Sequence, residues 1–257
     1  MRITRALVAG TAVAGLAAVL PMPAQAVNRN IAIVVHRGLH STVGEDTLPS
    51  QSNAYDNGLC AETDVRYSSD HKFIQSHDPT GLRVFGHPDK IAKTPFATIR
   101  TWRTLRGGQQ APTATESFNL VRDRKACLYM EIPQQWPMAR LQQLENEARA
   151  ANVLPYLHLY TASKANLRWF HANAWDIGWK AYENPRTDDL NDLHPAFVLV
   201  RPKWQSATTT NRLHAHGVLS GGGVQNQSSM WRAMDRNDDI ATTDSGLSAK
   251  TWRASHP

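Results

Sequence analysis

The sequence predicts an α/β protein of a single domain, with a (β/α)8 barrel as the expected architecture and an open doubly wound sheet as the alternative. Short apolar segments with strand composition alternate with helical patterns through most of the chain, which is typical of a parallel sheet with connecting helices. Several of these segments are apolar at every position, as parallel strands buried under helices on both faces are. The length suits one large domain with a substantial core.

Nine segments qualify as strands, one more than an eight-stranded barrel needs. Each is short, rich in β-branched or aromatic residues, and bounded by polar or turn-forming residues. They are residues 31–35, 60–65, 72–76, 127–132, 153–160, 175–182, 196–200, 216–220 and 239–243.

Four helices are expected between these strands. The first begins near Pro49 and ends at Gly58, because proline favours the first turn of a helix and glycine its end. The second follows Pro137 and has an apolar stripe formed by Met138, Leu141, Leu144 and Ala148. The third is capped by Thr161 or Ser163, and the fourth by Ser228 or Ser229. The longest departure from the alternation is the segment 79–126, which we expect to be an excursion carried on one loop.

The first 26 residues have the pattern of a secretory signal peptide. Arg2 and Arg5 precede a short apolar run, and Ala24-Gln25-Ala26 forms a small-residue cleavage site. The run is too short and too rich in alanine and glycine for a membrane anchor. We therefore expect export, cleavage after Ala26, and a mature domain formed by residues 27–257.

Charge and cysteine content restrict the partners. Without Arg2 and Arg5 the net charge of +6 falls to +4, and the lysines and arginines are scattered along the chain. This favours a small anionic ligand and gives no sign of a nucleic-acid-binding stripe. Cys60 and Cys127 are the two cysteines, and in an oxidising compartment they either pair or stay free.

Polar residues follow or end several of the predicted strands. His36-Arg37 ends the first, Glu62 and Asp64 share one face of the second, and His77-Asp78 follows the third. Because the carboxyl ends of parallel barrel strands meet at one rim, these side chains are expected to converge there. A lone His-Arg pair is more often a surface feature, so the hypothesis depends on the whole set.

Glu131 lies in an apolar strand, within "LYMEIP". An ionised carboxylate in such surroundings needs a metal ion or a basic side chain as its partner. Glu62, Asp64 and Glu131 offer hard oxygen ligands without a thiolate cluster, which favours Mg2+ or Ca2+ over zinc.

The segment "VVHRGLHSTVGEDTLPSQSNAYDNGLCAETDVRYSSDHKFIQSHDPT" resembles the opening of the glycerophosphodiester phosphodiesterase family. The family's blocks His-Arg-Gly, Glu-Asn-Thr, Glu-x-Asp-Val and His-Asp occur here in order and at matching spacing. Further on, "APTATESF", "YMEI" and "IATTD" are similar to later family segments. The resemblance is dense over 31–80 and sparse but ordered as far as Asp244.

This resemblance implies a TIM barrel that hydrolyses glycerophosphodiesters with the help of a divalent cation, Mg2+ or Ca2+. It assigns metal binding to Glu62, Asp64 and Glu131, acid/base catalysis to His36 and His77, and the organisation of substrate and metal to Arg37 and Glu45. The implied partner is a small anionic phosphodiester or a phospholipid head group, with transient contact to a membrane surface and a monomeric protein. Two alternatives are a barrel similar to secreted sphingomyelinase D, which cleaves sphingo- or lysophospholipids, and a non-catalytic lipid- or carbohydrate-binding barrel.

The chain departs from the family pattern at three places. Asp46 replaces the asparagine of Glu-Asn-Thr, Pro133 stands where a lysine often follows the metal-binding glutamate, and the run 216–227 replaces the family's Trp-Thr-x-Asn strand. Trp179 and Trp204 fall near strand ends, where a tryptophan either stacks on a choline-type head group or, more commonly, packs as bulk.

Overall fold

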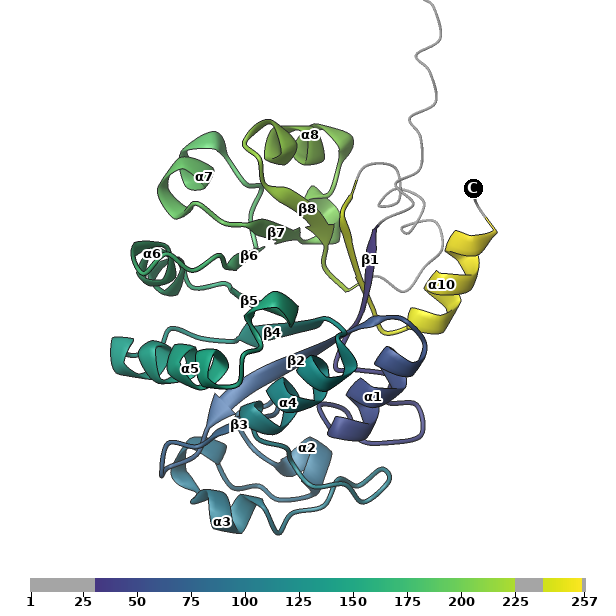
Figure 1. The fold of residues 1–257 in the computed structure, drawn as a ribbon, viewed down its shortest axis with the longest axis vertical. Coiled ribbons are helices and arrows are strands. Elements are labelled where there is room, and N and C mark those ends of the chain that lie inside the picture. The colour runs from purple at the N-terminus through teal and green to yellow at the C-terminus, as the bar shows by residue number, and fades with distance from the viewer. Residues whose placement is uncertain (1–30, 225–237, 256–257) are drawn as a thin grey trace, which may run out of the picture.

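Eight parallel strands close into a barrel in the computed structural model, which describes residues 31–224 and 238–255 (Figure 1). The strands are β1 (Ala32–Val35), β2 (Cys60–Tyr67), β4 (Leu128–Ile132), β5 (Leu157–Thr161), β6 (Gly178–Ala181), β7 (Phe197–Val200), β8 (Leu219–Gly222) and β9 (Ile240–Thr243), with β3 (Phe73–Gln75) outside the barrel. The main helices are α1 (Leu48–Asp56), α4 (Ala114–Arg124), α5 (Met138–Ala150), α6 (Lys164–Ala172), α7 (Thr187–Leu193), α8 (Ala207–Ala215) and α10 (Gly246–Ala254), and α2 (Leu82–Phe85) and α3 (Phe96–Ile99) are short. The signal-peptide segment 1–26 and the helix expected after Ser228 or Ser229 lie outside the described residues.

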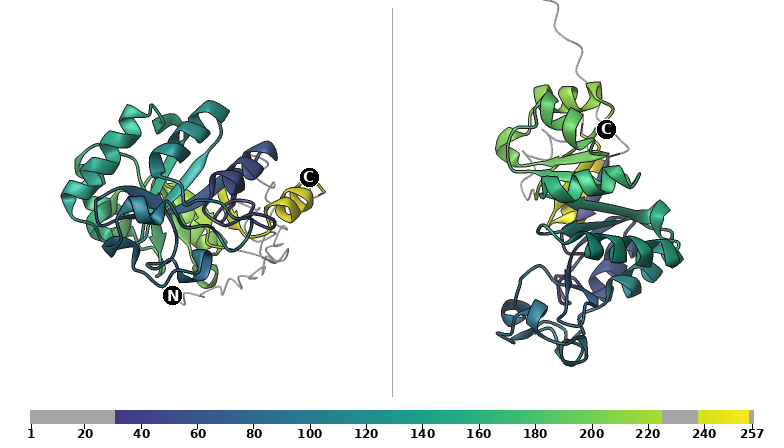
Figure 2. Two further views of the ribbon diagram at one scale, coloured as in Figure 1. Left: turned by 90° about the horizontal axis from the view of Figure 1, so that it is seen from below. Right: turned by 90° about the vertical axis from the view of Figure 1, so that its left-hand side faces the viewer.

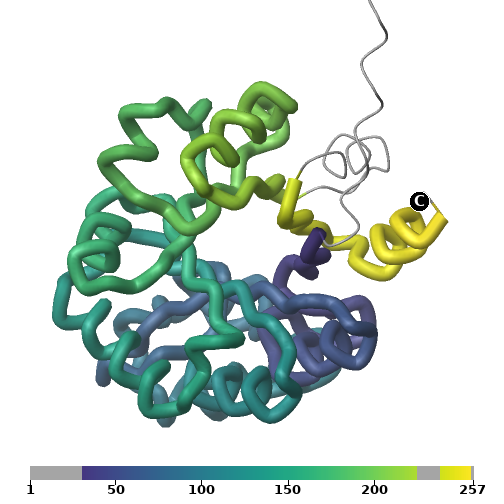
Figure 3. Tube along the Cα trace, turned by 45° about the horizontal axis from the view of Figure 1, so that its top comes forward, coloured from purple at the N-terminus to yellow at the C-terminus, as the bar shows by residue number. Residues whose placement is uncertain are grey.

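The barrel closes because the first strand pairs with both the second and the last. Val34 is in register with Cys60 of β2 and with Thr242 of β9. Figure 3 shows this closure, with the start of the described chain beside its final strand. The predicted (β/α)8 barrel is therefore confirmed, and the open doubly wound sheet is excluded. Among the described helices, none is long and apolar enough to cross a membrane.

Alternation along the strands separates two cores. One cluster packs the outer strand faces against the helices, including Leu141 and Leu144 of α5. A second, smaller cluster takes residues from the opposite faces of the strands, among them Val34, Tyr129 and Phe197. Since side chains two residues apart share a strand face, the residues that follow this inner cluster toward the carboxyl ends point to the barrel rim.

The third predicted strand does not belong to the barrel. β3 is antiparallel to β2, with Val65 opposite Gln75, so the expectation that its end meets the rim as a parallel strand is wrong. β2 extends to Tyr67, and β3 returns along it until the Ser76 amide donates to the Asp64 carbonyl at 3.0 Å. His77 therefore reaches the rim at the end of an antiparallel hairpin. β3 is the ninth strand, in addition to the eight of the barrel.

The predicted excursion 79–126 is shorter than expected. Its last part forms α4, a full barrel helix with the capping-box sequence Thr113-Ala-Thr-Glu116. The true excursion ends near residue 112 and contains α2 and α3, which lie together below the barrel in Figure 1 and protrude in the right-hand view of Figure 2.

Smaller differences concern the element boundaries. Residues 154–156, expected in a strand, form a short 3-10 helix, and Ser163 rather than Thr161 caps α6. Met138 is 69% exposed, so the predicted apolar stripe of α5 begins only at Leu141. Trp179 is 2% exposed and belongs to the outer core, which excludes it from stacking on a head group.

Cys60 and Cys127 form a disulfide, which decides the question that the sequence left open. The two residues lie at the amino ends of the neighbouring strands β2 and β4, with their Cα atoms 4.8 Å apart. The bridge joins segments separated by 67 residues in sequence and so restrains a long loop of the unfolded chain.

Removal of this disulfide should destabilise the protein without altering the barrel. We expect the variant Cys60→Ser/Cys127→Ser to lose about 2–4 kcal/mol in the free energy of unfolding, because the bridge lowers the entropy of the unfolded chain. Chemical denaturation with and without a reductant measures the loss. Two titratable thiols in the native, non-reduced protein would contradict the pairing.

Candidate active site

The chain makes a tight turn directly after β1, at the mouth of the barrel. Arg37 and Gly38 both have positive φ, 55° and 76°. A Cβ atom on Gly38 would lie 2.6 Å from the backbone and hydroxyl of Ser50 in α1, so only glycine fits there. The unusual backbone at Arg37 directs its amide to Glu62 Oε2, at 2.9 Å. Local strain of this kind is commonly retained at functional sites.

Three buried carboxylates meet at this mouth. Glu62 and Asp64 lie on β2, and Glu131 lies on β4 in register with Asp64. One oxygen from each lies within 4.8 Å of the others. Repulsion between such close anions is costly in a buried site unless cations or hydrogen-bond donors offset it.

Several donors surround the three carboxylates. Tyr160 Oη lies 2.8 Å from Glu62 Oε1 and 3.2 Å from Glu131 Oε2. Lys180 Nζ donates to Glu131 Oε2 at 2.6 Å, and Arg37 Nε lies 3.8 Å from Asp64 Oδ2. Neither oxygen of Asp64 accepts a hydrogen bond from any described group, although both are buried. Burial and the charge of Glu62 raise the pKa of Asp64 well above its ordinary value.

The orphaned oxygens of Asp64 are the structural test of whether a metal ion fits. A buried carboxylate without donors, facing two further carboxylates, offers the hard oxygen ligands that Mg2+ and Ca2+ prefer. The residues present therefore fit a divalent cation, with Glu62, Asp64 and Glu131 as its protein ligands.

Asp46 holds the backbone behind these carboxylates. Its Oδ1 accepts from Thr63 Oγ1 at 2.9 Å and from the Asp64 amide at 3.3 Å, and its Oδ2 accepts from the His77 amide at 3.1 Å. Burial raises the pKa of Asp46 to about 7, and the charges of Glu62 and Glu45 contribute. Because both oxygens accept, the carboxylate fixes β2 and the His77 segment together. An asparagine at this position has only one acceptor oxygen and could not accept from both segments with separate oxygens.

His77 is oriented through both its backbone and its ring. Arg66 donates to its carbonyl, and its Nδ1 lies 2.7 Å from Asp78 Oδ1. Since a carboxylate only accepts, Nδ1 carries the hydrogen and Nε2 is left for a ligand. Burial lowers the pKa of His77 below 6.5, opposed by the bond to Asp78 and assisted by the charge of Arg37.

His36 has the same arrangement on the other side of the mouth. Its Nδ1 lies 2.6 Å from Oδ1 of Asp244, which follows β9. Burial lowers the pKa of His36, but the bond to Asp244 and the charge of Glu62 outweigh it, so the pKa is raised above 6.5. The pKa of His36 is therefore raised and that of His77 lowered, each relative to an ordinary histidine.

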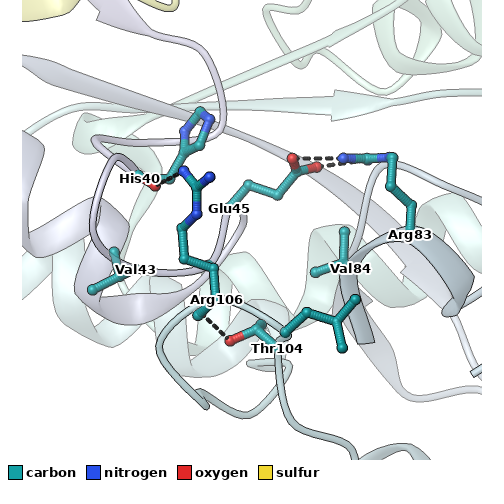
Figure 4. Close-up of a pocket in the computed structure, with 9 residues that line it drawn as sticks. His40, Val43, Glu45, Arg83, Val84, Thr104 and Arg106 are labelled. Atoms are coloured by element: carbon teal, nitrogen blue, oxygen red, sulfur yellow. Dashed lines mark hydrogen bonds and ion pairs between the residues drawn. The ribbon is translucent and has the colours of Figure 1, made fainter. Parts of the chain in front are cut away.

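An arginine of the excursion connects these groups. Arg83 of α2 donates to both oxygens of Glu45, each at 2.7 Å (Figure 4). It also donates to Asp78 Oδ2 at 2.6 Å. Glu45 also accepts from Arg37 at 3.0 Å. Arg83 therefore ties the carboxylate that holds His77 to the carboxylate that holds Arg37, and it lines a hollow of about 500 Å3 between the excursion and the loop after β1.

All of the site residues expected from the sequence lie at or around this mouth. Glu62, Asp64 and Glu131 are brought together directly, and Arg37 bonds Glu45. The sequence reasoning missed Arg83, Tyr160 and Lys180. A lysine inside the apolar strand 175–182 was the one available signal, because a charge there needs a partner.

This arrangement defines the class of the protein. Neighbouring cationic, carboxylate and imidazole groups at the carboxyl rim of a (β/α)8 barrel are those of a hydrolase that acts on an anionic ester. The sequence model of the glycerophosphoryl diester phosphodiesterase family matches residues 36–226. The chain belongs to this family, and it is therefore a phosphoric diester hydrolase.

Solved structures show the same fold at low sequence identity. A glycerophosphodiester phosphodiesterase from Parabacteroides distasonis is 15% identical, with a TM-score of 0.77 over 88% of this chain and 98% of that one. A phosphodiesterase from Oleispira antarctica, in complex with the product sn-glycerol-3-phosphate, is 20% identical, with a TM-score of 0.71 over 86% and 96%. A Thermotoga maritima glycerophosphodiester phosphodiesterase is 21% identical, with a TM-score of 0.72 over 86% and 98%. No curated protein matches the sequence.

Loss of the Asp46 carboxylate should affect both stability and catalysis. Asp46→Ala leaves three donors without this acceptor, and each buried unsatisfied donor costs about 1–3 kcal/mol. We expect a large fall in the free energy of unfolding and in kcat, with Asp46→Asn intermediate because it keeps one acceptor oxygen. Denaturation and steady-state kinetics measure both, with the exposed Asp56→Ala as control. An Asp46→Ala protein as stable as the parent would mean that the neighbouring backbone does not depend on Asp46.

Proposed function

We propose that the protein is a secreted, metal-dependent phosphodiesterase that hydrolyses glycerophosphodiesters to an alcohol and glycerol phosphate by two-histidine acid/base catalysis. The observation that carries the proposal is the orphaned Asp64 carboxylate within 4.8 Å of Glu62 and Glu131, in a mouth that also holds two carboxylate-bound histidines. The glycerol phosphate product of the Oleispira antarctica relative supports the proposed substrate.

The three carboxylates would hold the cation, Mg2+ or Ca2+. A bound divalent cation supplies charge neutralisation for the phosphoryl oxygens, which otherwise repel a nucleophile. Arg37 adds a guanidinium that can bond phosphoryl oxygens, while Glu45 holds its side chain from behind. Arg83 acts through Glu45 and Asp78 as a positioning residue.

The two histidines take opposite roles. His77, with a lowered pKa, is unprotonated near neutral pH and suits removal of a proton from the attacking oxygen. His36, with a raised pKa, keeps its proton and suits donation to the leaving alkoxide. In both rings Nε2 makes the transfer, since Nδ1 is bound to a carboxylate.

Export rests on the signal-peptide pattern, and the disulfide supports it because disulfides persist in oxidising compartments.

The excursion is the part we propose for transient membrane contact, with Leu82 and Leu105 exposed beside Arg83 and Arg106. We propose a monomer. A panel of glycerophosphodiesters against sphingomyelin and lysolipids separates the main function from the sphingomyelinase D-like alternative.

Removal of the metal should abolish turnover, and Glu131→Gln should weaken metal binding. The substitution removes one anionic ligand from the set and leaves the fold intact, because the amide is of similar size. Isothermal titration with Mg2+ and Ca2+ measures the affinity, and Glu145→Gln, a buried carboxylate in α5, is the matched control. Full activity in excess chelator, with no metal found by elemental analysis, would refute the metal assignment.

Replacement of either histidine by alanine should lower kcat by about 10²-fold or more with little effect on stability. The double variant should be scarcely worse than the worse single variant, because the two act as a unit. The exposed His171→Ala is the control.

The pH dependence separates the two roles. In the parent protein, kcat/KM should rise as His77 loses its proton, at a pKa below 6.5, and fall as His36 loses its proton, at a pKa above 6.5. A leaving group of low pKa should partly rescue His36→Ala and not His77→Ala. The reverse pattern of rescue would exchange the roles, and near-normal turnover in either variant would exclude the two-histidine mechanism.

A further inference from the structure

A second hollow, of about 280 Å3, joins the candidate active site on the side of β6, β7 and β8. His36 and Glu131 line it, so a ligand in this hollow reaches the catalytic groups directly. Its other wall carries Lys180, Tyr182 and Arg201. We call it the β6–β8 pocket. None of the family motifs found in the sequence accounts for the residues of this second wall.

Two cations lie close to one aromatic ring in this pocket. Lys180 Nζ is 5.9 Å from the centroid of the Tyr182 ring, and Arg201 Cζ is 4.2 Å from it. Lys180 is bonded to Glu131, but an ammonium has three hydrogens and can bind a second acceptor. Arg201 is exposed and makes no ion pair with a carboxylate in the described ranges.

The charge of the pocket selects against a cationic head group. Among the described residues that line it, Glu131 is the one acidic side chain, and it already pairs with Lys180. The face of Tyr182, which would otherwise suit a quaternary ammonium, is covered by the Arg201 guanidinium. A guanidinium with its hydrogen-bonding edge free binds carboxylate or phosphate oxygens well.

We propose that the β6–β8 pocket binds a second anionic group of the substrate, so that the preferred substrates are glycerophosphodiesters that carry a carboxylate or a further phosphate. This inference rests on the proposed function and deepens it. Lys180 and Arg201 are its specificity-determining residues. Lys180 also places a positive charge beside Glu131, whereas the sequence has Pro133 where the family pattern often has a lysine.

Kinetics with substrates of different charge tests the proposal. The metal-loaded protein is assayed with glycerophosphocholine, glycerophosphoglycerol, glycerophosphoglycerate, and glycerophosphoglycerol with a terminal phosphate. We expect kcat/KM for the two additionally anionic substrates to exceed that for glycerophosphocholine by about tenfold or more, as one charge-assisted contact provides. The carboxylate and phosphate substrates show which of the two anions the pocket favours.

Arg201→Gln should remove about tenfold from kcat/KM on the anionic substrates and leave glycerophosphocholine unchanged. Lys203→Gln is the matched control, because Lys203 lies two residues away against Trp204 and does not line the pocket. Equal kcat/KM for all substrates, or an equal loss on all substrates in Arg201→Gln, would overturn the proposal.

A binding measurement keeps this test separate from the proposed function. By calorimetry, glycerol bisphosphate should bind about tenfold more tightly than sn-glycerol 3-phosphate to the parent and to Lys203→Gln, and equally to Arg201→Gln. If no diester is cleaved but this preference holds, the proposed function fails and the anionic pocket stands. If diesters are cleaved and the preference is missing, the pocket assignment fails alone.

Discussion

Repulsion among the buried carboxylates Glu62, Asp64 and Glu131 is the constraint on which the rest of the site depends. Three anions with oxygens within 4.8 Å of one another are tolerated only with compensation from several directions. The amide of Arg37, the hydroxyl of Tyr160 and the ammonium of Lys180 come from three different strand ends of the barrel. The closed barrel provides this convergence because its parallel strands all end at one rim.

The strained turn after β1 and the β2–β3 hairpin are best understood from the same constraint. The positive φ of Arg37 turns its amide toward Glu62. The hairpin carries His77 back to the level of Asp64, where Asp46 bonds both backbones. The hairpin also adds Phe73 to the hydrophobic core, but the two devices share a polar role. Both hold polar groups at fixed positions around buried charge, which lowers the reorganisation needed when a reaction develops new charge.

The sequence predicted the barrel and the residues at its rim because both depend on local signals. Apolar runs ending in His, Asp or Glu are visible along the chain, and the parallel rim explains why they meet. The antiparallel direction of β3 could not be recognised, because a strand of three residues carries no sign of its direction in its sequence. The β8 strand was placed too early, since Gly221 and Gly222 lack strand character although Gly221 packs against Leu199 and Ile240. Arg83 was missed because its partners lie 38 and 5 residues away in sequence and meet only through the fold.

The site divides between the two halves of the barrel. The first half contributes Arg37, Asp64, His77 and the hairpin, whose backbone is fixed by hydrogen bonds to Glu62, Asp46 and Arg66. The second half contributes Lys180, which is bonded to Glu131, and Tyr182 and Arg201, which are both exposed. A reaction common to many diesters needs a rigid phosphate site, whereas choice among them needs groups that touch the variable part of the substrate. Pro133 carries no charge at a position where the family often has a lysine, whereas Lys180 of β6 places a cation against Glu131, so the positive charge beside this glutamate comes from β6.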